Sequence, residues 1–230
     1  MCMNVVTLTE IPFSISGEVL LKHVHLAPDA EDASEVLRMA REAQAIGIPK
    51  AMYQVSFVDK TGERSVTIDN IPFNSRVLRV NLDNSHRVFP YMATCGMELQ
   101  RWSTQFDDML AQYWADVIKA LALAEATSAL YRHIQMEYMP GPTGTMNPGS
   151  LRDWPISEQK PFFALFGSAT DTLGVHLSSS YLMTPNKSVT GLQFATEEQY
   201  QNCQLCPRED CPGRRAPYDE MRLEQYDTQP

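Results

Sequence analysis

The feature that most constrains the fold is one long stretch of helical periodicity in the middle of the chain. Apolar residues recur there every three or four positions, which is the spacing of side chains on one face of an α-helix. The repeating residues are Phe106, Met109, Leu110, Tyr113, Val117 and Leu121, and the pattern continues more weakly through Leu130 and Ile134. We therefore expect one long central helix with this apolar stripe in the core.

Shorter segments on both sides of this helix alternate between helical and extended patterns. Helices are expected from Asp29 to Gly47 and from Ser157 to Phe166. Strands are expected at residues 51–58, 64–68, 87–94, 175–183 and 188–194. Because strands and helices do not alternate strictly, the pattern favours an α+β class, with a mixed or antiparallel sheet flanked by helices and a Cys-rich C-terminal tail.

Charge and hydropathy exclude several classes of partner. The formal net charge of −9 repels phosphate backbones, and only Arg214 and Arg215 place basic residues side by side. No apolar run approaches the roughly 20 residues that span a bilayer, and the start of the chain lacks the basic flank of a signal peptide. We expect a cytoplasmic protein with no nucleic-acid or membrane partner.

Three of the five cysteines lie close together near the C-terminus. Cys203, Cys206 and Cys211 form a Cys-x2-Cys-x4-Cys pattern, and a Cys-x2-Cys turn lets two thiolates bind one metal centre. We predict a metal site that these three cysteines share with Cys95, whereas Cys2 has no expected role. Zinc and a 4Fe-4S cluster both take four thiolates, and reactive or merely buried thiols are the alternative.

The segment between residues 144 and 194 contains an ordered set of short motifs. It reads Gly144-Thr-Met-Asn-Pro-Gly-Ser150, then a helix, a strand, a Met183-Thr-Pro turn and a Ser188-Val-Thr-Gly191 strand. This order resembles the activation domain of cobalamin-dependent methionine synthase, in which an Arg-x-x-x-Gly-Tyr loop precedes a helix, a strand, a Met-x-Pro turn and a Ser-Val-Ser-Gly strand. The chain then divides into an activation-domain-like α+β domain, residues 1–196, and a Cys-rich metal-binding tail, residues 197–230, packed on it.

The resemblance implies a ligand site for S-adenosylmethionine. The cofactor-binding residues that it implies are Thr145, Asn147, Pro148, Gly149, Ser150, Tyr181, Ser188 and Gly191. Thr145 stands where the family has its Arg, and Ser150 stands where it has its Tyr, so S-adenosylmethionine is expected to bind weakly or not at all. Arg152 is a nearby substitute for the missing guanidinium. Turn and bulge geometry is an equal explanation for the prolines and glycines of this segment.

The resemblance also implies a partner. It predicts an accessory protein for the reductive activation of a corrinoid (cobalamin) protein or a split methionine synthase, with cobalamin supplied by that partner. Reductive activation of cobalt requires an electron, which favours a 4Fe-4S cluster over zinc and implies an electron donor protein. The alternative is a non-catalytic module that binds a corrinoid protein and carries structural zinc. An independent methyltransferase ranks last, because no Gly-rich nucleotide loop follows a strand.

Overall fold

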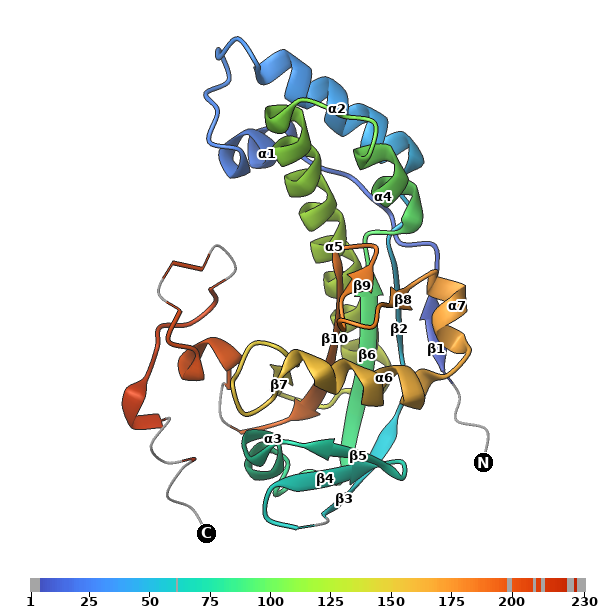
Figure 1. The fold of residues 1–230 in the computed structure, drawn as a ribbon, viewed down its shortest axis with the longest axis vertical. Coiled ribbons are helices and arrows are strands. Elements are labelled where there is room, and N and C mark those ends of the chain that lie inside the picture. The colour runs from blue at the N-terminus through green and yellow to red at the C-terminus, as the bar shows by residue number, and fades with distance from the viewer. Residues whose placement is uncertain are drawn as a thin grey trace.

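We analysed a computed structural model that describes residues 5–60, 62–197, 200–208, 210–211, 214–222 and 226. Figure 1 shows a curved molecule with a group of helices at one end and a small set of strands at the other. The C-terminal tail lies on the concave side, beside the sheet. Within the described residues no helix is both long and apolar enough to cross a membrane.

The sheet is organised around one central strand, β6 (Arg87–Thr94). One flank of β6 pairs with β10 (Ser188–Ala195), and the other pairs with β2 (Lys50–Tyr53) and then β3 (Ser56–Lys60). Every pairing is antiparallel. The outer strands are β1 (Val6–Leu8) beside β2, β7 (Thr143–Met146) beside β10, and β4 (Ser65–Ile68) and β5 (Ile71–Asn74) beyond β3. The antiparallel sheet flanked by helices confirms the predicted α+β class.

Helices cover both faces of this sheet. The second half of α5 (Met109–Tyr138) packs on one face, where Leu130 and Ile134 meet Phe89 and Tyr91 of β6. The opposite face carries Met92 in a separate core with side chains from three helices. These helices are α3 (Arg76–Asn81), α6 (Gln159–Phe166) and α7 (Ala169–Leu173). The short 3-10 helix η1 (Ile156–Glu158) leads into α6 and buries none of its own side chains.

The first half of α5 belongs to a different core. It packs with α1 (Gly17–His23), α2 (Ala33–Ile46) and α4 (Met97–Ser103) at the helical end of the molecule (Figure 1). The contribution of α5 to this core consists of Trp114, Ala115, Ile118 and Ala122. One helix therefore joins two separate apolar clusters.

The long helix is confirmed, but the face predicted to be buried is only partly in the core. Leu130 and Ile134 are fully buried, and Phe106, Val117 and Leu121 pack against the core of the helical end, whereas the first turns of the stripe are exposed. Met109 is 83% exposed, Leu110 45% and Tyr113 43%. The buried face also carries alanines, at positions 115, 122 and 126, between larger side chains such as Trp114 and Ile118. Alanine lets neighbouring backbones approach closely at these positions.

The predicted strand at residues 175–183 is also wrong. Only β8 (His176–Leu177) and β9 (Met183–Thr184) are extended, and they pair with each other as a small hairpin. The intervening turn is closed by two bonds between Ser178 and Leu182. Serine side chains compete for backbone hydrogen bonds in this way, which interrupts the extended pattern.

The described part of the tail packs against the sheet. Tyr200, Leu205 and Tyr226 belong to the same core cluster as Met92. The short 3-10 helix η2 (Asn202–Leu205) follows, and the backbone of Asp219 returns to bond the carbonyl of Gln204. The tail therefore contributes apolar side chains to the main core.

Replacing Leu130 by alanine tests the contact between α5 and the sheet. Leu130 is fully buried, so its truncation leaves a cavity and is expected to lower the free energy of unfolding by about 2–5 kcal/mol. Urea denaturation measures this change. Leu110→Ala on the exposed side of the same helix is the matched control, with an expected change within about 0.5 kcal/mol. Equal effects of the two substitutions would contradict the assignment of the buried face.

Candidate ligand site and cysteine tail

The loop after β7 is fixed to the sheet by the side chain of Asn147. Its Nδ2 donates to the hydroxyl of Tyr91 at 2.8 Å and to the carbonyl of Thr190 at 2.7 Å. The loop then closes on itself through a bond from the amide of Gly149 to the carbonyl of Trp154 at 2.8 Å. Gly149 has φ +88°, a conformation that favours glycine. The loop is thus held against β6 and β10.

Gly191 of β10 is required by the close approach of this loop. A Cβ atom at this position would lie 2.6 Å from the hydroxyl of Tyr91 and 2.7 Å from the carbonyl of Met146, and it would also collide with the Asn147 amide. Packing around the loop therefore explains this glycine without any ligand contact.

Two tyrosines meet beside this loop. The Tyr131 hydroxyl, on α5, donates to the Tyr91 hydroxyl at 2.9 Å, and the two rings contact edge to face. Burial raises the pKa of both phenols. For Tyr131 this rise is opposed by hydrogen bonds with Tyr91, Thr145 and Arg215 and by the charge of Arg215. We call Tyr91, Tyr131, Thr145, Asn147 and Arg215 the tyrosine site.

The structure brings only some of the predicted ligand residues to the tyrosine site. Thr145 is buried in β7 and Asn147 follows it. Ser188 lies at the start of β10, where its hydroxyl donates to the Thr94 hydroxyl at 2.8 Å. Tyr181 lies in the turn between β8 and β9, with the ammonium group of Lys160 over its ring. Pro148 is buried, while Ser150 and Arg152 are exposed. Ser188 and Tyr181 thus make their contacts elsewhere in the fold.

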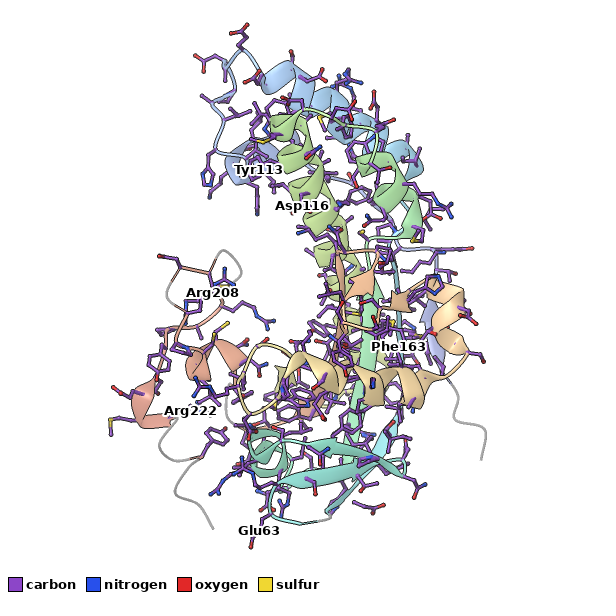
Figure 2. The ribbon with its side chains drawn as sticks, in the orientation of Figure 1. Glu63, Tyr113, Asp116, Phe163, Arg208 and Arg222 are labelled. Atoms are coloured by element: carbon purple, nitrogen blue, oxygen red, sulfur yellow. The ribbon has the colours of Figure 1, made fainter. Side chains whose placement is uncertain are left out.

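The tail runs along the open edge of β7. Gln201 forms an isolated parallel bridge with Thr145, and the Nδ2 of Asn202 donates to the carbonyl of Asn147 at 3.3 Å. Figure 2 shows Arg208 on the tail and Tyr113 and Asp116 on α5, on the two sides of the concave outline of the molecule. The tail thereby lies next to the tyrosine site.

One guanidinium organises the loop that carries the three tail cysteines. The Nη1 of Arg214 donates to the carbonyls of Cys203 at 3.0 Å and Ala216 at 2.9 Å. Its Nη2 donates to the carbonyl of Cys206 at 3.0 Å and also to that of Arg208. Backbone carbonyls with such partners need no other ligand. Arg214 therefore holds this loop together from within.

The tail cysteines have environments that differ from one another. The Sγ of Cys203 accepts from the backbone amide of Arg215 at 3.3 Å. Burial raises the pKa of this thiol, but the amides of Arg215 and Ala216 and the Arg215 charge outweigh that effect, and the pKa is lowered. Cys206 packs against the main core, and Cys211 is partly exposed. The thiolate form that a metal requires is thus favoured at Cys203.

Cys95 lies in another part of the molecule. It is fully buried among the helices of the helical end, and burial raises the pKa of its thiol to about 12. In the part of the chain that the structure describes, no group of three or more His, Cys, Asp or Glu residues is placed to hold a metal ion. The residues as folded here do not form a metal centre, so the four-cysteine site stays a prediction.

Comparisons with known proteins bear on the fold. No family model and no curated protein matches the sequence. A crystal structure of the MetH reactivation domain bound to AdoHcy matches with a TM-score of 0.61 and 13% identity, over 86% of this chain and 81% of that one. The chain has the fold of that domain. The likeness to a MetH reactivation domain agrees with the resemblance of the loop and strand motifs.

Sequence reasoning missed several residues of this region. Tyr91 and Tyr131 were expected only as parts of a strand and a helix, and Asn202 had no expected role. One signal was available for the tail, because Arg214 and Arg215 are the only basic residues side by side in an otherwise dispersed distribution. Their different roles depend on the path of the loop, which no local pattern reveals.

Replacing Arg214 by lysine tests its role as the centre of the loop. An ammonium group cannot reproduce a fork of donors to four carbonyls, so the loop should open more often. Amide hydrogen exchange at residues 201–216 is expected to become about tenfold faster, which corresponds to about 1.4 kcal/mol of local stability. Arg208→Lys is the control, because the Arg208 side chain is exposed. Unchanged exchange in the Arg214 variant would refute the role.

Proposed function

We propose that this protein is an accessory module that docks on a corrinoid protein, or on a split methionine synthase, and takes part in its reductive activation. The observation that carries the proposal is the shared fold with the MetH reactivation domain over 86% of the chain, at a TM-score of 0.61. The motif segments that resemble the activation domain support it, because the loop after β7 and the strand β10 meet at Asn147. Cobalamin belongs to the partner in this proposal.

The ligand that we propose for the tyrosine site is of the same class as AdoHcy, an adenosyl group linked to an amino acid. The site offers hydroxyl, amide and guanidinium groups beside a bonded tyrosine pair. Thr145 and Ser150 supply neither a guanidinium nor an aromatic ring on the loop itself. The loop does carry Arg152, but that side chain is exposed, so we propose that the strong contact to the amino-acid part of the ligand comes from another segment.

The docking proposal predicts co-purification with a corrinoid. Tagged protein, incubated anaerobically with extract of cells grown on cobalamin, should retain a fraction that shows the visible spectrum of a corrinoid. The retained corrinoid protein should then be reduced or methylated faster with this chain than without it. The tag alone on the same resin is the control. Absence of corrinoid from the retained fraction under these conditions would overturn the proposal.

We further propose that the tail cysteines serve electron delivery through a 4Fe-4S cluster, with an electron donor protein as a second partner. The lowered pKa of Cys203 supports a metal-binding thiolate there. Because the sulfurs are not gathered as folded here, binding would require the loop around Arg214 to rearrange. Structural zinc in a purely binding module is the alternative, and no reaction step is derived from either metal.

Anaerobic purification with iron, sulfide and zinc analysis separates these alternatives. Cys203→Ser should abolish binding of whichever metal is present, since a hydroxyl is a poor replacement for a thiolate. Cys2→Ser, which alters a cysteine outside the described residues, is the matched control and should leave metal content unchanged. Cys95→Ser decides the fourth ligand, because loss of metal would establish its role and unchanged content would remove it. Protein without iron or zinc would refute the metal site.

A further inference from the structure

We propose that the C-terminal tail completes the tyrosine site, with Arg215 holding the carboxylate of the ligand and Asn202 its ammonium group. This inference deepens the proposed function and rests on it for the class of ligand. It assigns binding residues to a segment that sequence reasoning treated only as a metal-binding tail.

The placement of Arg215 follows from three contacts along the tail. Gln201 pairs with Thr145, Asn202 bonds the backbone of Asn147, and the amide of Arg215 bonds the sulfur of Cys203. These contacts fix the backbone of residue 215 beside the loop that follows β7. From there its side chain opposes the rise in pKa that burial causes at two neighbours, the Tyr131 phenol and the Cys203 thiol, by hydrogen bonding and by its charge. The Tyr131 hydroxyl in turn bonds Tyr91. A positive charge from the tail thus lies at the tyrosine site, while the arginine of the loop itself, Arg152, has an exposed side chain.

The two adjacent arginines have different tasks. Arg214 is partly buried, and backbone carbonyls occupy both of its terminal nitrogens. Arg215 is exposed beside the tyrosines. A planar guanidinium that reaches solvent presents parallel N–H donors to a carboxylate. Arg214 therefore shapes the loop, and Arg215 is the residue of the pair that a ligand can reach.

Asn202 provides a second and independent sign of a ligand. The residue is 3% exposed, and its Oδ1 has no hydrogen-bond partner among the described residues, while its Nδ2 bonds the loop at Asn147. A buried acceptor without a partner costs free energy, and a ligand donor removes that cost. Oδ1 and Nδ2 share one carbon atom, so this acceptor lies close to the same loop.

The guanidinium of Arg215 and the unpaired acceptor of Asn202 together indicate which chemical groups the ligand carries. A cationic fork suits a carboxylate or a phosphate, but an unpaired acceptor on the same tail suits a donor such as an ammonium group. The α-amino acid end of a small molecule carries both groups on adjacent atoms. The net charge of −9 also disfavours a ligand with several negative charges. The site therefore fits the amino-acid end of a ligand of the AdoHcy class.

Isothermal titration calorimetry with two probes tests the assignment. AdoHcy carries the amino-acid end, whereas methylthioadenosine has the same adenosine and thioether without it. Arg215→Gln is expected to weaken AdoHcy binding about 10- to 100-fold, the usual effect of losing a charge-assisted pair, and to leave methylthioadenosine binding unchanged. Arg215→Lys keeps the charge without the fork and should give an intermediate loss for AdoHcy alone. Asn202→Leu, which removes the acceptor, should also weaken AdoHcy selectively.

Arg208→Gln is the matched control, because Arg208 is an exposed arginine of the same tail and should have no effect on either probe. Thermal unfolding of each variant separates a folding defect from a binding defect. Equal AdoHcy affinity in the wild type and in Arg215→Gln would overturn the assignment, as would a wild type that binds no AdoHcy. Equal loss for both probes would also overturn it, since Arg215 would then only support the fold. Corrinoid co-purification is measured separately, so the two proposals fail independently.

Discussion

Hydrogen bonding on both flanks of β6 is the constraint on which the rest of the structure depends. Each backbone group of a strand must find a partner when water is excluded, and β10, β2 and β3 supply these partners along β6. The alternation of the strand then sends Phe89 and Tyr91 towards α5 and Met92 towards the other core. The same alternation turns the Tyr91 hydroxyl towards the loop that carries Asn147.

The C-terminal tail is rich in polar residues, and a few side chains are enough to order it. Tyr200 and Leu205 anchor it in the main core, and Arg214 satisfies the carbonyls of the loop that follows. Charge-assisted hydrogen bonds to several carbonyls hold this loop in one conformation, which is the role that a bound metal has in small Cys-rich loops. The loop is therefore already folded before any metal binds, and Arg215 takes its position from that fold.

Much of the architecture could be predicted from sequence, because periodicity reports local geometry. The strand at residues 87–94 and the long helix were predicted, whereas the exposure of Met109, Leu110 and Tyr113 on that helix was not. Both sides of that helix carry apolar residues, and hydrophobicity alone cannot show that the face of Ala122 and Ala126 is the packed one. Thr145 and Asn147 of the loop motif both contact the tail, at Gln201 and Asn202, and their role as ligand residues stays a prediction. The contribution of Arg215 could not be predicted, because contact between residues 131 and 215 depends on the path of the whole tail.

The sharing of α5 between two cores has a mechanical consequence. The helix has 30 residues, which at about 1.5 Å per residue makes a rod of about 45 Å. It contains neither glycine nor proline, so it has no built-in hinge at which the two ends could swing independently. The helical end of the molecule and Tyr131, near the far end of α5, are therefore held at a separation that the length of one helix sets. Any force applied to the helical end would be transmitted along this helix to Tyr131.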